Sequence, residues 1–269
     1  MNSKIEQYLK RISYTGGTEP TLENLAALQR AHLMSVPYED LDIYYGRESS
    51  LTFDCVFDKI VTRHRGGYCF ELNGLFAWLL RSLGYRVEEY FGRWHAGEAL
   101  AVPLRRHRVL KVFLPEGEFI PDVGIGRVIP TRPFKCELET PQQLDDGKTY
   151  RVVADPILGK VIQCEENGVF GNYYSFDEAP QQNLDFTYVH YYLANHPESF
   201  FRHRLMVHIL TPCGRNSIVT TMDPETGEPV PELNVSQPDG TTEKTLLRTQ
   251  KQLAKALSAH FGIAADWLD

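Results

Sequence analysis

The chain of 269 residues contains no apolar run that approaches the roughly 20 residues needed to cross a bilayer. Residues 1–6 lack the apolar region of a signal peptide. The five cysteines are odd in number and irregularly spaced, which argues against a disulfide framework and favours a reducing compartment. We therefore expect a soluble cytoplasmic protein.

Patterns typical of metal or nucleic-acid binding are also missing. Neither C-x-x-C nor H-x-x-x-H occurs, so we expect no metal site. A formal net charge of −7 argues against a nucleic-acid-binding surface, although it is compatible with a local basic pocket for an anionic cofactor. The hydrophobic content of 42% and the charged content of 23% are typical of a globular protein, and the length allows two or three subdomains.

The most informative stretch is residues 65–73, with the sequence RGGYCFELN. The apolar residues that follow recur at helical spacing up to Gly84, a typical helix-terminating glycine, so we expect a helix that begins at Cys69. Unpaired N–H groups and the helix dipole at such an end favour a negative charge on the sulfur. Together with the basic residues 63–65, this predicts a nucleophilic cysteine. The alternative is an inert buried thiol.

A cysteine nucleophile needs a base and a group that orients the base. His107 begins one predicted strand, and Asp122 lies near the end of the next. A hairpin turn centred on residues 114–115 sets the two side chains opposite each other, with Cβ atoms about 5 Å apart. A turn centred on residues 116–117 offsets them by roughly 13 Å along the strand. The sequence pattern alone does not choose between the two turns.

The other histidines are weaker candidates for the base. His64 is flanked by arginines and is expected to be exposed. His190 and His196 lie among tyrosines and a proline, where structural roles are expected. The spacing of His203 and His208 does not fit a zinc site.

Four segments together resemble the arylamine N-acetyltransferase family. They are 36–43 (VPYEDLDI), 65–73 (RGGYCFELN), 107–110 (HRVL) and 122–126 (DVGIG), and they occur in the family's order and at its approximate spacing. The resemblance implies a Cys69–His107–Asp122 catalytic triad in which the histidine and the aspartate are hydrogen-bonded. The modest length and the lack of a long insertion before the last part of the chain are similar to bacterial members.

The resemblance also implies the acyl donor and its contacts. Acetyl-CoA is the donor in the family, and the loop that corresponds to Gly124, Gly126 and Arg127 lies near the CoA pyrophosphate. A glycine turn with exposed N–H groups and a neighbouring arginine is chemically suited to a phosphate. Tyr192 is expected to contact CoA by its position in the family alone. The chain has Ile125 where the family usually has Phe, a residue that helps to shape the acceptor pocket.

Further residues are expected to support the site. Asn73, one helical turn after Cys69, is placed to donate to a backbone carbonyl. Glu39 is expected to pair with Arg65 and so to hold the cysteine loop. Aromatic side chains can also wall a site for a flat substrate, although they are more often plain core. The candidate wall residues are Tyr38, Phe70 and Ile125.

The expected fold class is α+β. We expect a helical bundle with the nucleophile over residues 1–84, an antiparallel β-barrel with the histidine and the aspartate over 85–190, and an α/β lid over 191–269. By resemblance, the first two form a cysteine-protease-like or transglutaminase-like core. Local patterns predict a helical stretch over 54–64, a proline-rich loop over 224–238 and a final helix over 242–261.

These features predict an acetyl-CoA-dependent transferase that acetylates arylamines, arylhydrazines or hydrazides by a ping-pong mechanism through acetyl-Cys69. The Cys69 N–H is one expected donor to the oxyanion, and the sequence does not indicate the second. One alternative is a transglutaminase-like or peptidase-like thiol hydrolase with the same triad, which a groove for an extended peptide would favour. The other is a non-catalytic CoA-binding module, which an unreactive Cys69 would favour. We expect small-molecule partners, and neither nucleic acid nor membrane.

Overall fold

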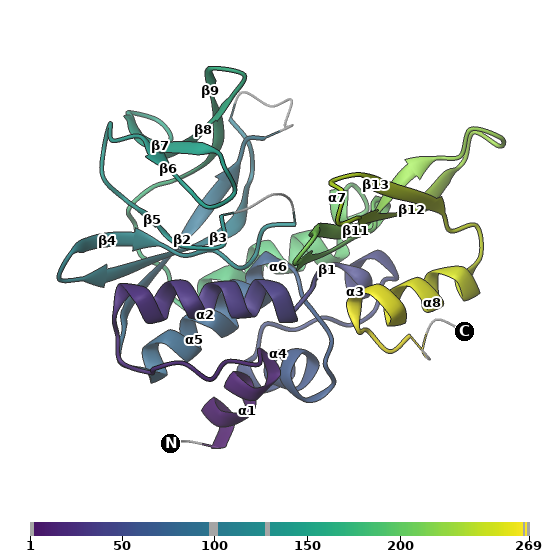
Figure 1. Ribbon diagram of the computed structural model, residues 1–269, viewed down its shortest axis with the longest axis horizontal. Coiled ribbons are helices and arrows are strands. Elements are labelled where there is room, and N and C mark those ends of the chain that lie inside the picture. Colours follow the sequence, from purple (N-terminus) through teal and green to yellow (C-terminus); the bar gives the residue numbers. More distant parts are fainter. Residues whose placement is uncertain (1–2, 97–101, 127–129, 266, 268–269) are drawn as a thin grey trace.

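Two antiparallel sheets, with helices packed around them, make up the structure (Figure 1). It is a computed structural model that describes residues 3–96, 102–126, 130–265 and 267. The larger sheet has eight strands and the smaller has five, which confirms the expected α+β class. The longest helices in the described ranges have 14 residues, and none there is long and apolar enough to cross a membrane.

The N-terminal part of the chain is mostly helical, as the apolar spacing predicts. Thr21 caps the second helix by accepting a hydrogen bond from the Asn24 N–H at 3.2 Å. The stretch expected as one helix over 54–64 is instead a short α-helix followed by a π-helical turn. The helices are α1 (Ser3–Arg11), α2 (Leu22–Ser35), α3 (Leu41–Tyr44), α4 (Phe53–Phe57), the π-helical turn (Asp58–Thr62) and α5 (Cys69–Ser82).

The larger sheet curves into a nearly closed barrel (Figure 1). Its strand order is β5-β4-β3-β2-β9-β8-β7-β6, and each neighbouring pair is antiparallel. The strands are β2 (Arg86–Trp94), β3 (Arg105–Leu114), β4 (Gly117–Ile120), β5 (Phe134–Lys135), β6 (Gln142–Gln143), β7 (Thr149–Asp155), β8 (Gly159–Glu166) and β9 (Val169–Phe176).

The smaller sheet joins distant parts of the chain. Its first strand, β1 (Tyr38–Glu39), pairs with β10, with Tyr38 opposite His208. The sheet order is β1-β10-β11-β12-β13. Its other strands and the helices of this region are β10 (Met206–Thr211), β11 (Gly214–Met222), β12 (Pro229–Ser236), β13 (Thr242–Leu246), a 3-10 turn (Asn183–Asp185), α6 (Phe186–Asn195), α7 (Phe200–His203) and α8 (Gln250–Phe261).

Two predictions for the C-terminal part were wrong. Residues 229–236, expected in a loop, form β12, and residues 242–246 form β13 along the edge of that strand instead of starting the last helix. The β-branched threonines of 242–246 favour an extended backbone. Helix α8 begins only after Thr249, whose hydroxyl accepts a hydrogen bond from the Gln252 N–H. The three-part division of the chain stays a prediction, and its second limit falls within α6.

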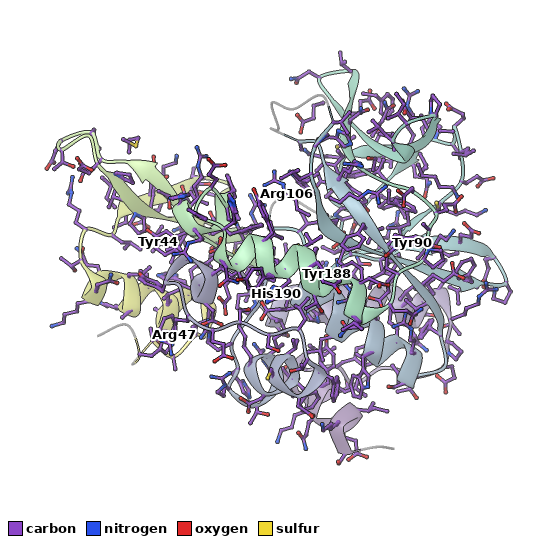
Figure 2. All side chains as sticks on the ribbon, turned by 180° about the vertical axis from the view of Figure 1, so that it is seen from behind. Tyr44, Arg47, Tyr90, Arg106, Tyr188 and His190 are labelled. Carbon is purple, nitrogen blue, oxygen red and sulfur yellow. The ribbon has the colours of Figure 1, made fainter. Side chains whose placement is uncertain are left out.

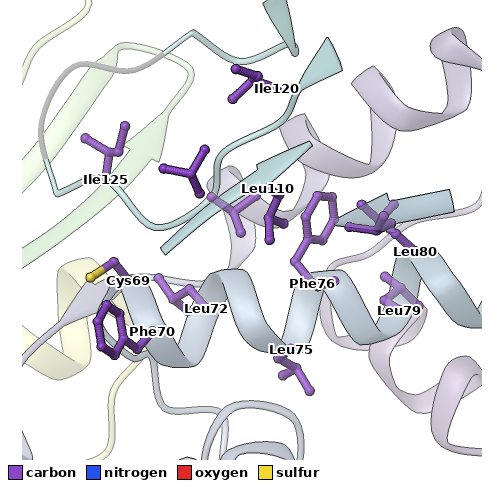
Figure 3. Packing of buried hydrophobic residues seen from close by; sticks show 14 of the residues in the cluster. Cys69, Phe70, Leu72, Leu75, Phe76, Leu79, Leu80, Leu110, Ile120 and Ile125 are labelled. Atoms are coloured by element: carbon purple, nitrogen blue, oxygen red, sulfur yellow. The ribbon is translucent and has the colours of Figure 1, made fainter. Parts of the chain in front are cut away.

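Helix α5 packs its apolar face into the largest hydrophobic core, against β2 and β3 (Figure 3). Leu72, Phe76 and Leu80 are completely buried there. A second core lies between the smaller sheet and α8, and Leu41 of α3 belongs to it. The segment from β1 to α3 therefore connects the two cores close to the start of α5.

The capping box of α8 can be tested by mutation. In Thr249→Ala the Gln252 N–H loses the side-chain acceptor that now lies 3.2 Å away, so the free energy of unfolding should fall by about 1 kcal/mol. Thr249→Ser keeps a hydroxyl and should lose less than about half of that amount. Urea denaturation followed by circular dichroism measures both variants. An unchanged midpoint in Thr249→Ala would show that the cap does not stabilise the helix start.

Candidate active site

Cys69 is the first residue of α5, as the sequence predicts (Figure 3). The residue is only 4% exposed, and its Sγ donates a hydrogen bond to the Arg106 carbonyl oxygen at 3.4 Å. The N–H of the preceding Tyr68 donates to the Glu71 carboxylate at 3.0 Å and so fixes the helix start. The first N–H groups of a helix have no partner within the helix, so this end favours a negative charge on the sulfur.

The backbone before Cys69 lies against the segment that contains β1. The Glu39 N–H donates to the Gly67 carbonyl at 2.9 Å, and the Gly67 N–H donates to the Pro37 carbonyl at 3.3 Å. A Cβ on Gly66 would lie 2.0 Å from the Pro37 carbonyl oxygen. Glycine is therefore required at position 66, because two backbones approach each other too closely for any side chain.

A buried ion network holds this loop in place. The Arg65 Nε donates to Glu39 Oε1 at 3.0 Å, which confirms the expected pair. Asp42, Lys59 and Glu71 complete the network, because Lys59 Nζ lies 2.8 Å from Asp42 Oδ2 and 2.9 Å from Glu71 Oε1. Removing one member of such a network leaves a buried charge uncompensated, which typically costs about 3–5 kcal/mol.

Asp42, Lys59 and Glu71 were not expected in this role. Burial lowers the pKa of Lys59, but the carboxylates of Glu39, Glu71 and Asp42 outweigh it, and the pKa is raised. Glu71 stands three residues after the helix cap, so the capping-box pattern was a usable signal. Nothing in the sequence separated Lys59 from an ordinary exposed lysine.

His107 and Asp122 meet through a turn that lies between the two predicted ones. Leu114 pairs with Gly117, so the two turn residues are 115 and 116. The ladder between the strands ends at Ile120, and Asp122 lies in the irregular segment after it. Because the chain has left the ladder there, the strand offset no longer fixes the separation. The His107 Nε2 lies 2.7 Å from Asp122 Oδ2, as the family resemblance implied.

Asn73 links helix α5 to the aspartate. Its side-chain amide donates to the Arg108 carbonyl at 2.7 Å, which confirms the expected backbone contact, and also to Asp122 Oδ1 at 2.9 Å. The Gly124 N–H donates to the same carboxylate oxygen at 2.8 Å. The sequence did not indicate these two contacts with Asp122. Together they leave one carboxylate oxygen directed to the histidine.

The environment of His107 favours the imidazolium form. Burial alone would lower the pKa of the ring, but the charge and hydrogen bond of Asp122, together with the Cys69 side chain, raise it to about 10. The Nε2 atom is engaged by Asp122. Nδ1 is therefore the ring nitrogen left for proton exchange with the sulfur.

Cys69 and His107 border a cavity of about 160 Å³. This volume is close to the roughly 150 Å³ of an engineered cavity that holds benzene. Tyr38 and Ile125, two of the predicted wall residues, line it, and both also border a second cavity of about 420 Å³. The wall residues that the sequence did not indicate are Trp94, Arg106, Phe200, Phe201, Arg204 and Met206. They become neighbours only because β2, β3, α7 and β10 converge at this point.

The remaining predicted residues lie as follows. Phe70 is completely buried, packs against Phe186 at a ring distance of 5.2 Å, and borders a different cavity. Tyr192 stacks on His196 at 4.5 Å on the exposed side of α6 and is not among the described residues that line the 160 Å³ cavity. Arg127 lies outside the described residues.

The two predicted glycines, Gly124 and Gly126, lie in the wall of the cavity. A Cβ on Gly124 would lie 2.8 Å from the Cys69 Cα, and one on Gly126 would lie 3.0 Å from the Tyr38 ring. The absence of side chains at these positions therefore lets the loop after β4 approach the nucleophile.

Comparisons with known proteins agree with this geometry. A family model described as N-acetyltransferase matches residues 21–267. The arylamine N-acetyltransferase / N-hydroxyarylamine O-acetyltransferase of Salmonella typhimurium is 34% identical over 207 residues, which is 77% of this chain and 73% of that protein. The arylamine N-acetyltransferase of Mycobacterium tuberculosis is 33% identical over 261 residues, covering 95% of this chain and 88% of that protein.

Solved structures show the same fold. The arylamine N-acetyltransferase of Mycobacterium marinum has a TM-score of 0.85 at 32% identity, covering 98% of this chain and 94% of that chain. The structure of that protein in complex with CoA has a TM-score of 0.83 at the same identity and coverage.

The close approach at Gly66 gives one prediction. In Gly66→Ala the new methyl group meets the Pro37 carbonyl, so the free energy of unfolding should fall by at least about 2 kcal/mol. The matched control is Gly171→Ala, where a Cβ would meet nothing within 4 Å, and it should stay within about 0.5 kcal/mol of the original protein. Urea denaturation measures both. Equal stability of the two variants would contradict the packing described here.

The His107–Asp122 pair gives a second prediction. In Asp122→Asn the charge that raises the histidine pKa is gone, so the pKa should fall from about 10 toward or below its ordinary value of about 6.5. NMR titration of the ring protons measures the change, with Asp239→Asn in an exposed turn as the control. An unchanged titration would show that Asp122 does not set the charge of the ring.

The same pair makes stability depend on pH. The folded-state pKa is raised, so the stabilisation is complete below about pH 6.5 and is lost as the pH rises through about 10. The free energy of unfolding, measured in urea at pH 6 and pH 9, should therefore fall more in the original protein than in Asp122→Asn.

Proposed function

The chain belongs to the arylamine N-acetyltransferase family, and we propose that it transfers an acetyl group from acetyl-CoA to an arylamine, an arylhydrazine or a hydrazide through an acetyl-Cys69 intermediate. The observation that carries the proposal is the 2.7 Å hydrogen bond between His107 and Asp122, beside the thiol of Cys69 at one small cavity. These three residues are the proposed catalytic triad.

In the first half-reaction, the Cys69 thiolate attacks the carbonyl carbon of the thioester. The charge that develops on the carbonyl oxygen is stabilised by the Cys69 N–H at the start of α5. The carbon–sulfur bond to CoA then breaks, and the leaving sulfur takes a proton from the His107 imidazolium. A raised histidine pKa suits this step, because the ring carries the proton before the attack.

In the second half-reaction, the acceptor nitrogen attacks acetyl-Cys69. An aromatic amine is neutral at pH 7, so its lone pair is available without prior deprotonation. His107, neutral after the first step, takes the proton that the nitrogen loses, and the Cys69 thiolate leaves. The hydrogen bond to Asp122 keeps the ring oriented through both steps.

The shape of the cavity favours a small acceptor over an extended peptide. Its volume of about 160 Å³ corresponds to one aromatic ring, which supports a transferase rather than a peptidase-like hydrolase. Tyr38 and Ile125 are the proposed walls of the acceptor site, because both line this cavity.

The donor contacts are proposed from the family and from the loop after β4. Gly124 and Gly126 border the cavity, and the lack of side chains there suits a close approach of CoA. For Arg127 and Tyr192, the support is the position in the family alone. A cytoplasmic location is proposed on the same basis as before, the absence of a signal-peptide pattern.

Acetylation of the protein without an acceptor tests the mechanism. Incubation with acetyl-CoA should add one acetyl group, which mass spectrometry of a peptide digest should place on Cys69, and an arylamine should remove it. His107→Ala should acetylate at least about 100-fold more slowly, because no group delivers the proton to CoA.

His190→Gln is the matched histidine control, because His190 is hydrogen-bonded to Tyr68 at 2.7 Å and does not line the cavity. It should keep the acetylation rate within a few-fold. If Cys69 stays free in the folded, reduced original protein, acetyl-CoA is not the donor.

A further inference from the structure

Two arginines line the same cavity as Cys69. The guanidinium carbon of Arg106 lies 5.5 Å from the centre of the Phe200 ring, and that of Arg204 lies 5.3 Å from it. Arg106 comes from β3 and lies in the region between the two sheets (Figure 2), whereas Arg204 directly follows α7. Two separate elements therefore bring cationic groups to one aromatic ring at the wall of the cavity.

The charge of the cavity differs from that of the whole chain. The formal net charge is −7, yet none of the described residues that line the cavity carries a carboxylate. Arg204 makes no ion pair with any residue in the described ranges, and its side chain is exposed. The cavity is thus positive in an acidic protein, which favours an anionic group on a molecule bound there.

The size of the cavity separates two sources of negative charge. In acetyl-CoA the thioester is joined to the diphosphate by an arm about as long as an extended tetrapeptide, roughly 13–14 Å. With the thioester at Cys69, the diphosphate therefore lies beyond a cavity of about 160 Å³. An anionic group within reach of both Cys69 and these arginines belongs to a small acceptor.

The length of an arginine side chain fits such an acceptor. The Arg106 carbonyl oxygen is 3.4 Å from the Cys69 Sγ, and an extended arginine side chain spans about 6 Å from Cα to the guanidinium carbon. In a para-substituted aminobenzoate, the amine nitrogen and the carboxylate carbon are also separated by about 6 Å. Guanidinium groups bind carboxylates with well-defined planar geometry and stack on aromatic rings.

We propose that Arg106 and Arg204 form a carboxylate subsite, so that this protein prefers aromatic amines that carry an acid group, such as aminobenzoates, over neutral ones. The inference rests on the acetyl transfer proposed above and goes beyond it by assigning a charge to the acceptor. The two arginines are specificity-determining residues in it, and Phe200 is the ring that supports both guanidinium groups.

The test uses an acyl donor without phosphates, p-nitrophenyl acetate, and two acceptors of nearly equal shape, 4-aminobenzoate and 4-aminobenzamide. The measured quantity is the ratio of their kcat/KM values for the discharge of acetyl-Cys69. In Arg204→Met this ratio should fall about tenfold, because a charged hydrogen-bond partner is lost. The kcat/KM for 4-aminobenzamide should change less than about twofold, and Arg204→Lys should give an intermediate ratio.

Arg86→Met, which removes an exposed arginine on the barrel, is the matched control and should leave the ratio unchanged. Arg106→Met should lower the ratio as well. Because Arg106 precedes His107, the Arg204 variants carry the decision if Arg106→Met perturbs the fold.

Two results would overturn the inference in different ways. An unchanged ratio, with a raised KM for acetyl-CoA but not for p-nitrophenyl acetate in Arg204→Met, would assign the arginines to the phosphates of CoA. Failure of p-nitrophenyl acetate and of acetyl-CoA to acetylate Cys69 in the original protein would remove the acetyl transfer itself, and the subsite with it.

Discussion

The buried ion pair between Arg65 and Glu39 connects every part of the site. Arg65 precedes the glycines of the cysteine loop, and Glu39 lies in β1, between that loop and the smaller sheet. The other oxygen of the Glu39 carboxylate accepts the Leu41 N–H at 2.9 Å and so fixes the start of α3. One side chain thus holds a loop, a strand and a helix, and the Lys59 ammonium group balances its charge. The position of Cys69 depends on electrostatics that never contact a substrate.

Helix α5 transmits this order to the proposed acid–base pair. Cys69 is at its first position, and Asn73, one turn later, donates to Asp122 and to the backbone of β3 beside His107. The nucleophile and the group that orients the base are therefore set by one rigid element. The separation of sulfur, imidazole and carboxylate does not rely on the irregular segment after β4 alone.

The sequence carried the local features of this site and not its non-local ones. The helix start at Cys69, the cap at Thr21 and the Arg65–Glu39 pair follow from patterns within short segments or within one family motif. The turn at residues 115–116 was missed because the strand pattern fits several registers, and the ladder stops before Asp122. The cavity walls from α7 and β10 had no signal, since they reach Cys69 only through the packing of the second sheet.

The pairing of β1 with β10 has a consequence for the order of assembly. Tyr38 and Glu39 lie between the cysteine loop on one side and His208 and Val207 on the other, although these partners are far apart in the chain. A growing chain on the ribosome contains Cys69 long before it contains β10, and domains form only when their distant partners have been synthesised. The loop that presents the thiol therefore gains its second flank late, which delays a finished reactive centre until most of the polypeptide has emerged. Because contacts of such long range form slowly, this step is also expected to limit the rate at which the folded enzyme appears.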